Sequence, residues 1–191
     1  QTGTFTYAYG GDMNGDKVNF NDLMFVPLKG SDIRFEPIRA TSSPTSAIIF
    51  TEAQQQDAFE NYIKQDSYLR TRRGMYTERN ASVLPMLHRI DLSVTQDFFI
   101  KIAGKNNNFQ FRADILNFTN LLNKDWGVSK RVTNPNILNA RPAVGGVPFF
   151  QMATITDASG NRSLVKDTYQ KNASVFDVWQ AQFTLRYIFG K

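Results

Sequence analysis

The chain has 191 residues, enough for one domain or for a substantial piece of a larger protein. Its 22 Lys and Arg residues outnumber 17 Asp and Glu by five, but no basic run exceeds two residues, which argues against nucleic acid as a partner. The lack of Cys excludes disulfides, thiol nucleophiles and Cys-based zinc sites. No apolar stretch reaches the ~18 residues of a membrane helix. The first residues lack a secretory signal, so we expect a mature, processed or truncated chain.

The first part of the chain predicts one strand and then a long loop. Residues 4–9 alternate polar and apolar side chains, the period of a strand with one buried or lipid-facing side. From 12 to about 88 the chain is rich in Pro, Ser, Thr, Asn and Asp, as loops are. A helix over about 52–68 interrupts this stretch, because Thr51 and Gln54 form a capping box before an apolar face. We interpret the helix as an insertion docked on another part of the protein, not as a domain.

Three later segments alternate for longer than half-buried strands of soluble proteins usually do. They are 90–102, 108–118 and 179–189. Their polar faces carry charges and amides, and their apolar faces are rich in aromatic residues. The first two are joined by a turn at about 103–106. A change of phase near Asn117 predicts a β-bulge.

The connections between the predicted strands are either very short or very long. Residues 120–178 are again irregular, with one hairpin expected between 149–155 and 163–167. About ten tilted residues cross a bilayer core, and outer-membrane barrels have short periplasmic turns and long extracellular loops. The sequence therefore predicts an all-β fold, the C-terminal antiparallel strands of a large transmembrane β-barrel with one short loop helix. The loops about 10–88 and 120–178 would be extracellular and the turn about 103–106 periplasmic. A soluble β-sandwich is the alternative, since its strands also alternate.

Several sequence segments resemble one receptor family. The runs HRIDLSVTQDF (88–98), FQFRADILNFTN (109–120) and FTLRYIF (183–189) resemble the C-terminal strands of TonB-dependent outer-membrane receptors, the Oar-like group of Bacteroidota in particular. The segments 12–16 and 21–27 resemble a loop that recurs in that group. Plug and TonB box are absent from these residues, and Phe189 is followed by two more residues instead of being terminal.

The resemblance implies a place and a set of partners. Residues 1–191 would be the C-terminal segment of a receptor β-barrel of about 22 strands in the Gram-negative outer membrane. The complete protein would import a ligand with energy from TonB. The implied partners are membrane lipid and lipopolysaccharide, the plug and other strands of the same receptor, and TonB through the plug.

One loop offers oxygen ligands at regular spacing. Asp12, Asn14, Asp16 and Asp22 occupy positions 1, 3, 5 and 11 of the segment. Hard cations such as Ca²⁺ take six to eight oxygen ligands, so the spacing predicts a structural Ca²⁺ site at the base of an extracellular loop. The segment departs from the EF-hand, because Lys17 stands where Gly makes the turn and the closing acid comes one residue early. An Asx-rich turn without metal is the other interpretation.

Four arginines follow the predicted helix, namely Arg70, Arg72, Arg73 and Arg79. They would either recognise carboxylates or phosphates, including those of lipopolysaccharide, or form a solvated face with ordinary ion pairs. We favour the second interpretation. His88, the only histidine, is expected to be a hydrogen-bonded residue at the rim of a strand.

Two functions from different classes remain. No nucleophile–base pair, phosphate loop or paired carboxylates stand out, so we predict that the chain is not an enzyme. The first hypothesis is a portion of an outer-membrane receptor and transporter whose long loops contact an extracellular ligand. The second is a secreted, calcium-stabilised β-sandwich that binds a glycan or a protein.

The sequence also predicts a register for the first hairpin. If residues 103–106 form the turn, Asp97 lies opposite Arg112 and Thr95 lies opposite Asp114. Both pairs then fall on the polar face, and no like charges are directly opposed.

Overall fold

A computed structural model describes residues 3–172 and 174–188, which are mostly β, with 40% strand and 15% helix, and its sheets are not closed. Within these residues, no helix has the length and apolar character needed to cross a membrane. The chain divides into two compact units. The first contains Pro85–Lys130 and the chain from Lys171 onward, and the second contains Thr2–Leu84 and Arg131–Gln170.

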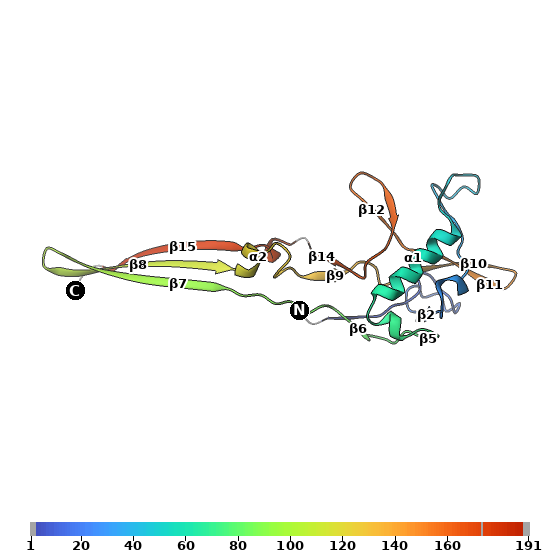
Figure 1. Ribbon diagram of the computed structural model, residues 1–191, viewed down its shortest axis with the longest axis horizontal. Helices are drawn as coiled ribbons and strands as arrows, with labels where there is room; N and C mark the ends of the chain where they lie inside the picture. Colours follow the sequence, from blue (N-terminus) through green and yellow to red (C-terminus); the bar gives the residue numbers. More distant parts are fainter. Residues whose placement is uncertain (1–2, 173, 189–191) are drawn as a thin grey trace. The chain divides into compact units, whose positions relative to one another are not determined.

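The first unit is built on a three-stranded antiparallel sheet (Figure 1). Its order is β15-β8-β7, formed by β7 (Leu92–Ile102), β8 (Lys105–Leu116) and β15 (Gln180–Ile188). The unit also contains the short helix α2 (Phe118–Leu122) and the 3-10 helix η3 (Val175–Asp177). The three predicted alternating segments are thus confirmed as neighbouring strands. Phe189, expected near the end of the last strand, lies outside the described residues.

The turn between β7 and β8 is shorter than the sequence predicted. It contains two residues, Ala103 and Gly104, with φ of 49° and 79°. Two consecutive positive φ values are the signature of a type I′ hairpin turn, whose twist matches that of the flanking strands. Ile102 therefore pairs with Lys105, and the register is shifted by two residues from the expected one.

This shift makes the predicted cross-strand pairs wrong. Thr95 lies opposite Arg112, and Asp97 lies opposite Gln110, whose Nε2 donates to Asp97 Oδ1 at 3.0 Å. Arg112 instead forms an ion pair along its own strand with Asp114, at 2.8 Å. All these side chains stay on the polar face, because a shift by an even number of residues preserves the pleat.

The predicted bulge near Asn117 is also wrong. β8 ends at Leu116, and Asn117 adopts the left-handed conformation, with φ 53° and ψ 48°, directly before α2. Asn tolerates this conformation because its short side chain forms local hydrogen bonds. Here its buried Nδ2 donates to the carbonyls of Gly127 and Asp177, while its backbone N–H donates to Asp91 Oδ1. The residue ends the strand and starts a helical turn.

The second unit consists of short strand pairs around one helix. The pairs are β1 (Thr4–Phe5) with β6 (Ser82–Val83), β2 (Phe25–Val26) with β5 (Met75–Tyr76), β3 (Ile38–Arg39) with β4 (Ile48–Phe50), β10 (Leu138–Val144) with β11 (Val147–Met152), and β12 (Thr154–Thr156) with β13 (Arg162–Leu164). A further pair is β9 (Lys130–Val132) with β14 (Tyr169–Lys171). The helices are α1 (Glu52–Gln65), η1 (Gly30–Asp32) and η2 (Leu69–Thr71).

These elements correct the prediction of two irregular loops. Large parts of the two long connections fold together and share one core, and α1 packs against that core, as a docked helix was expected to do. The expected strand 4–9 is reduced to β1 with an isolated bridge at Ala8. The expected hairpin strand 149–155 is divided, since β11 pairs with β10 and only β12 pairs with β13.

Helix α1 supplies one side of the core. Its capping box is confirmed, because the backbone N–H groups of Thr51 and Gln54 donate to each other's side chains. The helix ends at Gln65, three residues before the predicted end. It buries an apolar face against residues from the whole unit. The largest fully buried apolar side chains are Tyr7, Tyr62, Phe35, Phe59, Met24, Ile63, Leu69, Ile137, Leu138 and Met152.

Candidate functional site

The acidic loop at the start of the chain directs its carboxylates at its own backbone. Asp12 accepts hydrogen bonds from the N–H groups of Gly15 and Lys17, at 2.7 and 2.8 Å. Asp22 Oδ2 accepts from the N–H of Met13 at 2.7 Å. Side chains that satisfy nearby N–H groups in this way define Asx turns.

The third carboxylate of this loop is held by a similar set. Asp16 accepts from the backbone N–H of Val18 and from the side-chain amides of Asn21 and Asn14, at 2.8 to 3.1 Å. These bonds, that of Val18 foremost, hold the pKa of Asp16 below its ordinary value. Over residues 3–172 and 174–188, no group of three or more His, Cys, Asp or Glu side chains is arranged to hold a metal. The turn accounts for the four predicted ligands, and Ca²⁺ binding stays a prediction.

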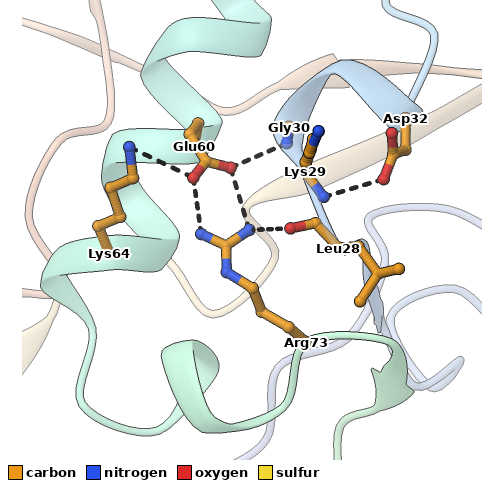
Figure 2. A network of polar contacts seen from close by, with 7 residues as sticks. All are labelled: Leu28, Lys29, Gly30, Asp32, Glu60, Lys64 and Arg73. Carbon is orange, nitrogen blue, oxygen red and sulfur yellow. Dashed lines mark hydrogen bonds and ion pairs between the residues drawn. The ribbon is translucent and has the colours of Figure 1, made fainter.

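The best-connected arginine of the predicted cluster is Arg73 (Figure 2). Its Nη1 and Nη2 donate to the two carboxylate oxygens of Glu60 on α1, at 3.0 and 2.8 Å, and Nη1 also donates to the carbonyl of Leu28. Glu60 further accepts the N–H of Gly30 and lies 3.4 Å from Lys64. This network connects α1 to η1 and to the segment after η2. Its role is structural.

Two other members of the cluster are likewise engaged. Arg72 forms an ion pair with Glu78, and its guanidinium lies 5.3 Å from the ring centre of Tyr68. Arg79 donates to the carbonyl of Asn21 at 3.4 Å, a weak contact. Ion pairs therefore occupy Arg72 and Arg73, in agreement with the interpretation as an ordinary polar face.

A buried group of titratable side chains lies beside the core. Asp66 Oδ2 accepts the hydroxyls of Tyr7 and Thr168, at 2.7 and 2.6 Å, and Tyr7 also contacts the hydroxyl of Tyr62 at 3.1 Å. Asp66 Oδ1 accepts two further backbone N–H groups from the turn that follows α1. Burial raises the pKa of Tyr7 and raises that of Tyr62 to about 12. With every oxygen of the carboxylate occupied and closed off from solvent, this network serves stability.

His88 lies in an exposed segment of the first unit. It lines an apolar pocket of about 420 Å³, together with Met86 and Trp126. Met86 and Trp126 are exposed apolar side chains, and the hydrogen-bonded role expected for His88 stays a prediction.

A pocket that sequence reasoning missed brings arginines together from distant parts of the second unit. It has a volume of about 300 Å³ and is lined by Glu36, Arg39, Arg141 and Arg162, among others. Arg141 Nε donates to Glu36 Oε2 at 2.7 Å, whereas Arg39 and Arg162 donate to uncharged oxygens. Arg39 precedes Arg141 and Arg162 by more than a hundred residues, which hid this group from any search for local motifs.

The sheet of the first unit presents a continuous apolar face. Residues directly opposite one another bring most apolar positions of the three strands to the same side, where Gln96, Lys105 and Asn107 are the polar exceptions. Two ring pairs stack across β8 and β15, Phe109 with Tyr187 and Phe111 with Phe183. The large apolar side chains exposed on this face are Leu92, Val94, Phe98, Ile100, Ile102, Phe111, Phe183, Leu185 and Tyr187.

The opposite face of the same sheet is polar. It carries Asp97, Lys101, Arg112, Asp114 and Arg186, with Phe99, Leu116 and Ile188 as exposed apolar exceptions. Comparisons of the chain with protein families, with curated proteins and with solved structures find no match. The chemistry of these surfaces is therefore the basis for the function.

Proposed function

We propose that the chain is a portion of an outer-membrane receptor and transporter, in which β7, β8 and β15 form part of the wall of a transmembrane β-barrel. The observation that carries the proposal is the apolar face of this sheet. Phe183 and Leu185, at 67% and 72% exposure, are typical of its uncovered side chains. Contiguous apolar patches of this kind mark a surface that contacts protein or membrane, because water penalises exposed apolar area.

The dimensions of the sheet support lipid as the partner. Its strands contain 9, 11 and 12 residues, and about 9–11 tilted residues cross the hydrocarbon core. Apolar side chains facing outward and charged side chains facing a water-filled interior are the alternation of barrel strands.

The two edges of the sheet support a larger barrel. β7 and β15 each pair on one side only within the described residues, which leaves a row of backbone donors and acceptors on either edge. In lipid such an edge is strongly unfavourable, because its polar groups have no water to bind. Further strands of the same receptor would satisfy both edges. We include the plug, TonB and lipopolysaccharide as proposed partners, because the family resemblance implies them.

The second unit would then be the part that meets the extracellular ligand. It is built from the two long connections of the barrel, which in outer-membrane proteins lie outside the cell. Its pockets, one mainly polar and one mainly apolar, and its self-contained core suit a binding module.

The rival β-sandwich would need a second sheet over the apolar face. The described strands of the first unit form one sheet, and its apolar side chains are uncovered within that unit. A secreted sandwich would also remain monodisperse in plain buffer, whereas a barrel portion depends on detergent or lipid.

Site-directed spin labels test the proposal in the complete protein in outer-membrane vesicles. Labels at Leu92 and Leu185, on the apolar face, should be relaxed by oxygen, which concentrates in lipid. Labels at Ser93 and Thr184, on the polar face, should respond to a water-soluble nickel complex. The opposite pattern, or equal access of nickel to all four positions, would exclude a lipid-facing sheet.

A further inference from the structure

We propose that the pocket lined by Arg39, Arg141 and Arg162, here called the arginine pocket, binds a phosphate or sulfate ester group of a sugar. The inference goes beyond the proposed function, since the membrane proposal concerns the sheet of the first unit. The arginine pocket lies wholly in the second unit and would stand if that sheet did not contact lipid.

The three arginines come from three different strands or strand ends. Arg39 belongs to β3, Arg141 to β10 and Arg162 to β13. Arg39 Nη1 donates to the carbonyl of Ser46 at 2.7 Å, and Arg162 donates to the carbonyl of Arg39 and to the hydroxyl of Thr154 at 3.3 Å. These uncharged acceptors orient the guanidinium groups without neutralising them.

The charge around the pocket is unbalanced. Three arginines and one carboxylate, that of Glu36, leave a formal charge of +2 (three minus one) among the lining residues. Glu36 forms its ion pair with Arg141. In the described part of the chain, neither Arg39 nor Arg162 has a carboxylate within ion-pair distance. Like charges repel, so a pocket lined by three arginines and one carboxylate favours an anionic ligand.

The donor geometry suits a tetrahedral oxyanion. Guanidinium groups present parallel N–H donors that match two oxygens of a phosphate or sulfate at once. The hydroxyls of Thr41 and Ser42 line the same pocket and can donate to a third oxygen. A volume of about 300 Å³ holds such a group with part of the molecule that carries it.

An adjoining pocket indicates what carries the ester. It has a volume of about 400 Å³, shares Glu36, Pro37 and Arg141 with the arginine pocket, and adds the half-buried aromatic ring of Phe149. Aromatic rings attract the polarised C–H groups of a sugar through their negative faces. A sugar ring bound in this adjoining pocket would direct its ester group toward the guanidinium groups of the arginine pocket.

The test uses the full 191-residue chain in detergent, titrated calorimetrically with glucose 6-phosphate, inorganic phosphate and glucose at constant ionic strength. We expect glucose 6-phosphate to bind more tightly than phosphate, and glucose to give no measurable binding. An affinity for phosphate equal to that for the sugar phosphate would overturn the ester assignment. Absence of binding by both anions would overturn the site.

Variants locate the binding. Replacing Arg39 and Arg162 together by Gln, which retains a hydrogen-bond donor, should weaken glucose 6-phosphate binding about tenfold or more, because two charge-assisted bonds are lost. Arg70→Gln with Lys166→Gln is the matched control, since it removes the same two charges from exposed positions of the same unit outside the pocket. Binding in the double variant as tight as in the control would overturn the proposal.

A variant that should tighten binding distinguishes a lost binding site from a damaged fold. Glu36→Gln removes the one carboxylate of the pocket and should tighten binding severalfold, a gain that a damaged fold does not give. Unchanged or weaker binding in Glu36→Gln, with an unaltered circular dichroism spectrum, would count against electrostatic recognition at this pocket.

Discussion

The two units use the same apolar residue types for opposite purposes. In the second unit, Phe35 and Phe59 are buried by their own chain. In the first unit, Phe98 and Phe183 are exposed on one side of the sheet. Phe content therefore says little about where a hydrophobic core lies. What distinguishes the units is whether each unit supplies, from its own residues, a second layer over its apolar side chains.

Polar groups follow the same division. The buried carboxyl group of Asp66 is fully hydrogen-bonded within the second unit, as a polar group enclosed by protein must be. On the polar face of the sheet, Asp97 and Arg112 have single partners and remain open to water. The second unit satisfies its buried polar groups with hydrogen bonds from its own residues. Within the first unit, most of the side chains on both faces of the sheet stay exposed.

The largest expected effect lies in the core of the second unit. Phe59→Ala should destabilise that unit by about 3–5 kcal/mol, because it removes a fully buried ring and leaves a cavity. Hydrogen exchange of the α1 amides, followed by mass spectrometry, measures the change. Phe183→Ala is the matched control and should leave the exchange of α1 unchanged. If both variants changed the hydrogen exchange of α1 equally, the distinction between a buried and an exposed Phe in the two units would be wrong.

The next effect concerns the buried hydroxyl network. Tyr7→Phe removes a donor to Asp66 Oδ2 and leaves a ring of nearly the same shape. We expect a loss of about 1–3 kcal/mol, because the carboxylate stays buried with one donor fewer. Chemical denaturation followed by circular dichroism measures it. Tyr76→Phe, at an exposed ring, should cost almost nothing, and a comparable loss there would contradict the role given to burial.

Much of the fold could be predicted where the signal is local. The capping box at Thr51 and Gln54 depends on residues three positions apart, and the alternation of β7, β8 and β15 depends on every second residue, so both were found. The two-residue turn at Ala103-Gly104 was missed, because Ala favours negative φ and the positive φ is imposed by strand pairing. At Asn117 the change of phase was real, but it reflected the end of a strand.

The second unit could not be foreseen for the opposite reason. Its core joins residues such as Tyr7, Tyr62 and Ile137, which are far apart in the chain, and most of its strands have only two or three residues. Such strands are too short to show a period. The arginine pocket was hidden in the same way, while the adjacent arginines after α1 drew attention and proved to be largely paired.

A smaller effect should appear in the pH dependence of the second unit. Burial raises the pKa of Glu60, but hydrogen bonds from Arg73 and Gly30 outweigh it, so the folded pKa lies below the ordinary value of 4.5. A lowered folded pKa stabilises the fold above the unfolded value and loses this contribution as pH falls through the folded value. We expect about 0–1 kcal/mol, since the pair is partly exposed. Denaturation midpoints between pH 7 and 3 should fall less in Glu60→Gln; an identical pH profile would contradict the assignment.

The last prediction concerns the register of the sheet, and the substitutions that test it should change stability the least. Residues directly opposite in an antiparallel pair have Cα atoms about 4.5–5.5 Å apart, within the range that a disulfide spans, whereas positions displaced by two residues lie about 7–8 Å apart. Thr95 and Arg112 are directly opposed, but Asp97 and Arg112 are displaced.

Because the chain has no Cys, two double variants can be compared without background. Thr95→Cys with Arg112→Cys should oxidise rapidly and fully, while Asp97→Cys with Arg112→Cys should remain mostly reduced. The exposed side chains involved contribute about 0–1 kcal/mol, so neither pair of substitutions should unfold the sheet. The reverse order of crosslinking would restore the four-residue turn and remove the type I′ turn on which the observed register depends.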